Sequence, residues 1–177
     1  MKKLTLSLGV LTALLAANSS FAATTGSVYI NGKIEGQTCR LTDDSVTQHI
    51  RIPTGYTRDL GNAGDVSPQQ ERFAIKIIEC EKNVTAGIRF DRTNVEANNA
   101  GTLRNIYQGR NAAKNVNIQL LHEDKPINLA AQTQDHYLTT ITYDDTINYQ
   151  YAARYYATAQ AERGEVRTLT TFQIDYK

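Results

Sequence analysis

The residue types that could do chemistry in this chain of 177 residues are few, and most of them stand apart. The three histidines, His49, His122 and His136, are mostly far apart in sequence. The adjacent carboxylates Asp43-Asp44 and Asp144-Asp145 are typical of solvated turns rather than of an acid–base pair. No serine stands in a G-x-S-x-G motif, and Gly109-Arg110-Asn111 lacks the further glycines and the lysine of a phosphate-binding loop. The sequence therefore predicts neither an enzyme nor a site for a cofactor or a metal.

The first 22 residues have the pattern of a secretory signal peptide. Lys2 and Lys3 precede a mostly apolar run, and Ser20-Phe21-Ala22 places small residues at the −3 and −1 positions of a cleavage site. The apolar run is shorter than a typical membrane span. Removing 22 of 177 residues leaves 155, which suits one domain with a core. Loss of the two lysines takes the formal charge from +1 to −1, so no basic excess remains to bind nucleic acid.

The two cysteines, Cys39 and Cys80, both lie in the part predicted to be exported, where disulfides form and persist. Two cysteines permit a single intramolecular pairing. A redox or metal site would need a C-x-x-C motif or nearby histidines, which the sequence lacks. We therefore predict a structural disulfide between Cys39 and Cys80.

The elements that must carry this disulfide are predicted to be β-strands, because apolar residues recur with a period of two. The alternating runs are Val28–Ile34, Val46–Ile52, Phe73–Ile77, Val84–Phe90, Val116–Leu120, Tyr149–Ala157 and Phe172–Tyr176. Turn-forming residues separate the runs, as in an all-β sandwich. At Ile78 the alternation changes parity, which predicts a bulge or an end to the half-buried pattern. The stretch from Ser67 to Glu71 predicts a short helical turn with Pro68 at its first position.

The chain has ten tyrosines, four phenylalanines and no tryptophan, and a stripe of tyrosines runs along residues 149–157. One interpretation is that these rings pack the sandwich and keep their hydroxyls at its rim. The other is that some line a subunit or ligand interface, where tyrosine is enriched. Of the two, packing is favoured.

The order and spacing of several segments resemble the chaperone–usher family of fimbrial subunits, in particular type 1 pilus-like subunits. The resemblance covers nearly the whole exported chain. The matching segments are Val28–Ile34 shortly before Cys39, Ile78–Cys80, Asn115–Leu120, Ala153–Ala157 and the ending Phe172–Tyr176.

The resemblance implies an incomplete immunoglobulin-like β-sandwich that lacks its final strand. An N-terminal arm of the next subunit would then fill the open groove, which is strand addition at a sheet edge. It also implies a division into a signal peptide (1–22), a donor-strand arm (23–36) and a pilin domain (37–177). The donor face of the arm would consist of Val28, Ile30, Gly32 and Ile34. The strand that lines the acceptor groove would carry Phe172, Ile174 and Tyr176.

The function implied is that of a structural subunit of a bacterial surface pilus, most like the major shaft pilin, that supports adhesion. The expected partners are other copies of the chain, a periplasmic chaperone, an outer-membrane usher and minor or tip pilins. The expected location is the fimbrium at the cell surface, reached through the periplasm. Two alternatives remain open: a minor adaptor pilin, and a self-contained secreted β-sandwich that binds a ligand. An ordinary first strand, folded back into its own domain, would show the same alternation as Val28–Ile34.

Overall fold

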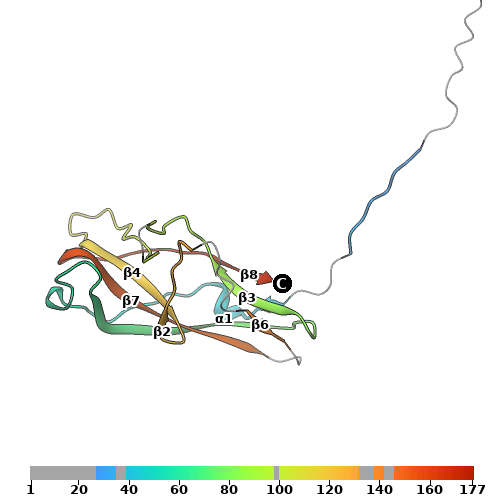
Figure 1. Ribbon diagram of the computed structural model, residues 1–177, viewed down its shortest axis with the longest axis horizontal. Helices are drawn as coiled ribbons and strands as arrows, with labels where there is room; N and C mark the ends of the chain where they lie inside the picture. Colours follow the sequence, from blue (N-terminus) through green and yellow to red (C-terminus); the bar gives the residue numbers. More distant parts are fainter. Residues whose placement is uncertain (1–26, 35–38, 98–99, 132–137, 142–145) are drawn as a thin grey trace, which may run out of the picture. The chain divides into compact units, whose positions relative to one another are not determined.

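The computed structural model describes residues 27–34, 39–97, 100–131, 138–141 and 146–177. The chain divides into two units, residues 1–34 and 35–177. The first 26 residues, and with them the predicted signal peptide, lie outside the described residues. In the first unit, residues 27–34 carry neither helix nor strand. All the described helices and strands belong to the second unit (Figure 1).

The second unit is built from β-strands with two short helical segments. The strands are β1 (Arg40–Leu41), β2 (Val66–Ile78), β3 (Thr85–Phe90), β4 (Lys114–His122), β5 (Lys125–Pro126), β6 (Thr139–Thr140), β7 (Ile147–Glu162) and β8 (Phe172–Tyr176). The helical segments are α1 (Asp43–Val46) and η1 (Thr57–Asp59). No helix within the described ranges is long and apolar enough to span a membrane.

The strands form two antiparallel sheets. The larger sheet has the order β1-β2-β7-β4-β5, and its long central strand β7 pairs with β2 on one side and with β4 on the other. The smaller sheet has the order β6-β3-β8, with Ile88 of β3 opposite Ile174 of β8. The two antiparallel sheets confirm the prediction of an all-β protein.

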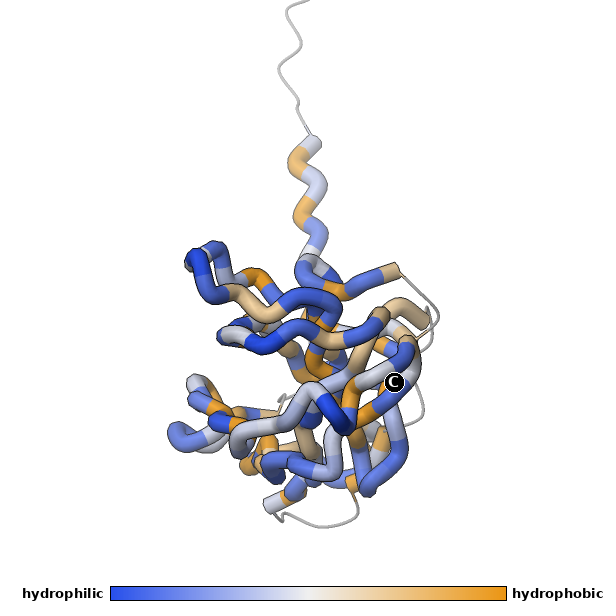
Figure 2. Tube along the Cα trace, turned by 90° about the vertical axis from the view of Figure 1, so that its left-hand side faces the viewer, coloured by the Kyte–Doolittle hydropathy of each residue, from blue (hydrophilic) through white to orange (hydrophobic). Residues whose placement is uncertain are grey.

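The core contains side chains from both sheets, and the alternation explains which ones. Ile75 and Ile77 of β2 are buried, as are Ile88 and Phe90 of β3. The ring of Phe90 meets the ring of Tyr151 of β7 edge-on, with 5.2 Å between the ring centroids. Figure 2 shows apolar segments among the hydrophilic outer stretches of the chain. In β2 and β3, burial of the apolar face therefore specifies the register of pairing.

The run Val46–Ile52, predicted as a strand, is not one. Residues 43–46 form α1 instead, Val46 is 61% exposed, and residues 47–56 carry no strand. Side chains take the place of a backbone ladder here. The Ser45 hydroxyl accepts a hydrogen bond from the Lys76 amide at 3.0 Å, and the Gln48 amide group donates to the Ala74 carbonyl at 2.7 Å. These bonds satisfy backbone groups of β2 that a neighbouring strand would otherwise pair.

The helical turn predicted for Ser67–Glu71 is also wrong, because this stretch belongs to β2. Gln70 pairs with Arg154 of β7, and the register shifts between Val66 and Gln70. Such an irregularity tolerates Pro68, which has no amide hydrogen to donate to the ladder. The parity change at Ile78 is confirmed as a strand end: β2 stops there, and the next residue, Glu79, has a φ of 55°.

Candidate strand-acceptor edge and N-terminal arm

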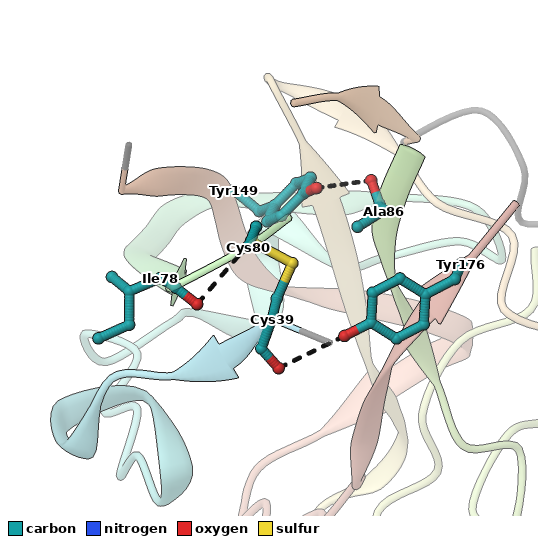
Figure 3. The surroundings of a disulfide bond; sticks show 6 residues. All are labelled: Cys39, Ile78, Cys80, Ala86, Tyr149 and Tyr176. Carbon is teal, nitrogen blue, oxygen red and sulfur yellow. Dashed lines mark hydrogen bonds between the residues drawn. A yellow bond between two sulfur atoms is a disulfide. The ribbon is translucent and has the colours of Figure 1, made fainter. Parts of the chain in front are cut away.

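A disulfide joins Cys39 and Cys80, as predicted, across a sequence separation of 41 residues. Cys39 directly precedes β1, and Cys80 follows β2 by two residues. The two strands pair through Arg40 and Ile78, so the bond continues the end of this ladder (Figure 3). Both cysteines are buried. The disulfide therefore anchors the start of the second unit to the larger sheet.

Two tyrosine hydroxyls connect this region to the smaller sheet, and Figure 3 shows both. Tyr149 of β7 donates a hydrogen bond to the carbonyl of Ala86 in β3 at 2.7 Å. Tyr176 of β8 donates to the carbonyl of Cys39 at 3.4 Å. Burial raises the pKa of Tyr149, since a charged phenolate would lose its hydration. The two hydroxyls thus join the two sheets beside the disulfide.

Strand β8 lies at an edge of the smaller sheet, and its hydrogen-bonding pattern shows which residues face outward. The Lys177 amide donates to Thr85, and Thr171 accepts from the Asp91 amide. In an antiparallel ladder, the residues that exchange bonds with the partner alternate with residues whose backbone groups point away from it. Phe172, Ile174 and Tyr176 therefore aim their N–H and C=O groups away from β3. Within the described ranges, no strand pairs with this outer side.

The side chains of the same three residues lie on the apolar face of β8. Phe172 and Ile174 pack against the core but are only partly buried, and Tyr176 is 39% exposed. The alternate residue Asp175 forms an ion pair with Arg89 of β3 at 3.2 Å on the other face. The edge thus combines outward backbone groups with an incompletely covered apolar surface.

The described part of the predicted arm, residues 27–34, is exposed throughout and carries aliphatic side chains at positions 28, 30 and 34. Val28 is 86% exposed, Ile30 89% and Ile34 100%. A Cβ added at Gly32 would meet no atom within 4 Å. Exposure of three large aliphatic side chains in one short segment leaves a surface that a partner could bury.

The tyrosine stripe packs the core, which confirms the packing part of the favoured interpretation, but the Tyr149 hydroxyl is buried between the sheets rather than placed at their rim. Tyr149 and Tyr151 are 3% and 2% exposed. Tyr155 is partly buried, and its hydroxyl lies 3.5 Å from the carbonyl of Ile52. Burial raises the pKa of Tyr155 as well. The stripe therefore supplies cohesion between elements rather than an open ligand surface.

The other residues considered for chemistry do not converge. Asp44 pairs with Lys76 at 2.8 Å on the surface, and the pKa of Asp44 is lowered chiefly by its hydrogen bond to that lysine. His122 lies against Tyr151, and burial lowers the pKa of this histidine. His136 and the pair Asp144-Asp145 lie outside the described residues. Among those that are described, no three His, Cys, Asp or Glu side chains group as metal ligands would.

Sequence reasoning placed the apolar face of β8 but missed the direction of its backbone groups. The period of two shows that Phe172, Ile174 and Tyr176 share a face. Whether their amides point toward β3 or away from it depends on the pairing register, which no residue type reveals. The contact between Tyr176 and Cys39 was missed for the same reason.

The fold defines a class of protein: two-sheet β-proteins with an apolar N-terminal segment and a C-terminal strand that is an edge among the described strands. Comparison with known proteins identifies the family. Residues 28–177 match the family described as fimbrial protein. The chain is 34% identical over 170 residues to the major fimbrial subunit SMF-1 of Stenotrophomonas maltophilia, covering 92% of this chain and 96% of that protein. It is 29% identical over 185 residues to the type-1 fimbrial protein A chain of Escherichia coli, covering both chains completely.

A solved structure of a chaperone–usher pilus contains a similar fold. The two chains share 19% identity with a TM-score of 0.62, over 89% of this chain and 99% of the other. The chain described here belongs to the fimbrial protein family. It is thus a structural, non-enzymatic protein of surface fimbriae, and the resemblance seen in its sequence is confirmed.

Proposed function

We propose that this chain is a subunit of a chaperone–usher pilus that polymerises by donating residues 23–36 as a strand to the β8 edge of the next copy. In this interpretation the second unit is an immunoglobulin-like sandwich that lacks its final strand, and residues 1–22 are removed on export. The observation that carries the proposal is the edge itself. Phe172, Ile174 and Tyr176 present backbone groups that no described strand pairs, together with partly exposed apolar side chains, on one strand.

The arm has the properties that such an edge requires. Val28, Ile30 and Ile34 would all point to one face of an added strand, with Gly32 on the same face where the groove is shallow. Burying three aliphatic side chains is worth roughly 5–9 kcal/mol before ordering costs are subtracted. A slip of one residue would aim Asn31 and Lys33 at the apolar surface instead, so the register of the added strand is strongly specified.

Residues 27–34 carry neither helix nor strand, so this segment has no secondary structure of its own that strand addition would have to undo. Relatives named major fimbrial subunits favour the shaft over a minor adaptor position. Before assembly, a periplasmic chaperone would cover the β8 edge, and an outer-membrane usher would exchange it for the arm.

A mixing experiment with two half-functional variants tests the proposal. The first variant lacks residues 23–34, so it can accept an arm but has none to give. The second carries Ile174→Asp, which places a charge in the middle of the apolar edge and leaves the arm intact. Neither should polymerise alone, but together they should form a complex of one copy each. Gln173→Asp is the matched control, because Gln173 is exposed on the other face of β8; it should polymerise normally.

Two results would contradict the proposal. One is the formation of long polymers by the chain without residues 23–34. The other is equal loss of polymerisation in Gln173→Asp and Ile174→Asp, which would indicate a general effect of charge on β8. Circular dichroism and resistance to protease of each variant establish that the second unit has folded.

A further inference from the structure

The arm also contains the one Asn-Gly pair in the sequence, Asn31-Gly32. We propose that this pair is a site of spontaneous deamidation in the unassembled subunit, and that the products limit the time during which the arm can be donated. The chemistry of the pair is independent of the arm's role, but the consequence for assembly rests on the proposed function.

The reaction needs only water and a backbone free to move. The Gly32 backbone nitrogen gives up its proton to hydroxide and attacks the side-chain amide carbon of Asn31. A carbon–nitrogen bond forms, ammonia leaves, and a five-membered succinimide results. Water then opens the ring at either carbonyl. One opening leaves an aspartyl residue with the normal backbone, and the other leaves an isoaspartyl residue, whose main chain runs through the former side chain.

The surroundings of Asn31 and Gly32 favour this attack. Both residues are exposed, and the segment that contains them carries no helix or strand whose hydrogen bonds would hold the Gly32 amide in place. A Cβ at position 32 would obstruct the ring closure, and glycine has none.

Asn62-Ala63 provides an internal comparison, because it too is an exposed asparagine followed by a small residue. There the asparagine is held in a turn: its backbone amide donates to the Asp65 carboxylate at 2.7 Å, and its carbonyl accepts from the Asp65 amide at 3.1 Å. Its side-chain amide lies 3.4 Å from the same carboxylate. These bonds oppose the rotation that ring closure requires, so Asn62 should react far more slowly than Asn31.

An isoaspartyl residue at position 31 would disable the arm as a donor. It adds one atom to the main chain between Ile30 and Gly32, so the two halves of the arm can no longer keep one alternating register. Ile34 would leave the face that carries Val28 and Ile30. Once the arm is paired in a polymer, ladder hydrogen bonds should hold Asn31 and protect it. The subunit would then have a limited lifetime before assembly and a long one afterwards.

The test incubates purified unassembled chain and assembled polymer under identical mildly alkaline conditions. Peptide mapping by mass spectrometry follows the change from amide to acid, and isoaspartyl methyltransferase labels the isoaspartyl product. We expect labelling of Asn31 in the unassembled chain at least tenfold faster than labelling of Asn62, and faster still as pH rises. The aged wild-type chain should lose the ability to donate, whereas Asn31→Gln, in which ring closure is disfavoured, should keep it. Gly32→Ala should slow the labelling.

The possible results separate this inference from the proposed function. Labelling of Asn31 no faster than that of Asn62 in the unassembled chain would overturn the deamidation site. Fast labelling in the unassembled chain and in the polymer alike would leave the site established but would show that assembly does not pair the arm. Retention of full donor activity by a chain labelled at Asn31 would overturn the lifetime limit.

Discussion

Removal of the Cys39–Cys80 disulfide should destabilise the second unit by an amount set by the length of the loop that the disulfide closes. The double variant Cys39→Ala/Cys80→Ala frees the stretch that the bond closes. In the native state this stretch includes β1, α1, η1 and the whole of β2. Without the bond, the unfolded chain gains freedom while the folded chain keeps its paired strands β1 and β2.

The magnitude follows from the separation of 41 residues. In the chain-entropy description, closing a loop of that length lowers the entropy of the unfolded state by about 13 cal/mol/K, or about 4 kcal/mol at 25 °C. Because both cysteines are buried, the variant also loses a small amount of packing. With a urea dependence of about 2 kcal/mol/M, the midpoint of unfolding should fall by about 2 M.

Equilibrium unfolding in urea, followed by tyrosine fluorescence and circular dichroism, measures this shift, since the chain has ten tyrosines and no tryptophan. Both proteins are measured with the same saturating concentration of a peptide of residues 27–34, so that strand addition contributes equally. Reduced wild-type protein is the matched control, because it opens the same loop without changing a side chain. A loss below about 1 kcal/mol in both samples would refute the reasoning, since the loop would then be restrained by something other than the disulfide.

Two further predictions concern single residues. Gly101→Ala should destabilise the fold by more than about 2 kcal/mol in urea unfolding. The reason is that Gly101 has a φ of +56° and an added Cβ would lie 2.7 Å from the backbone nitrogen of Leu129. A free energy of unfolding within about 0.5 kcal/mol of the wild-type value would contradict this prediction. Burial raises the pKa of Tyr149 and Tyr155 in the folded chain, so above about pH 10 these two tyrosines should ionise first in the unfolded chain and stability should fall as pH rises. Burial raises the pKa of Tyr149, and Tyr149→Phe should therefore lose about 1 kcal/mol at neutral pH but fall less steeply in alkali; an unchanged slope would argue against a buried hydroxyl.

Strands that carry alternating apolar residues were predictable from the sequence. Val84–Phe90 and Val116–Leu120 became β3 and β4 because burial of their apolar side chains is favourable whatever the details of the pairing. The burial of Asn117 and Gln119 on the other face of β4 was not predictable in this way. The pairing of Cys39 with Cys80 was predictable by simple counting. In each case one physical effect determined the outcome: burial of apolar side chains for the strands, and oxidation of the two thiols for the disulfide.

Predictions failed where side chains and backbone competed for the same partners. The run from Val46 to Ile52 alternates, yet the side chains of Ser45 and Gln48 bond to β2 in place of a ladder. Pro68 is typical of a helix start, yet pairing of β2 with β7 outweighed that local preference. The outward direction of the Ile174 backbone likewise follows from the register with β3, a long-range property.

An edge such as β8 is a liability in an isolated protein, because unpaired backbone groups beside apolar side chains recruit any available strand. In the proposed polymer the same edge is always occupied, first by a chaperone and then by an arm. Ligand binding to the folded state stabilises it by about 2.7 kcal/mol when the ligand stands at a hundred times its Kd. In the proposed polymer the arm of a neighbour would act as this ligand, so folding of one copy and attachment of the next would become one thermodynamic event. Damage to the arm at Asn31 would therefore appear as lost stability in the neighbour that should have received it.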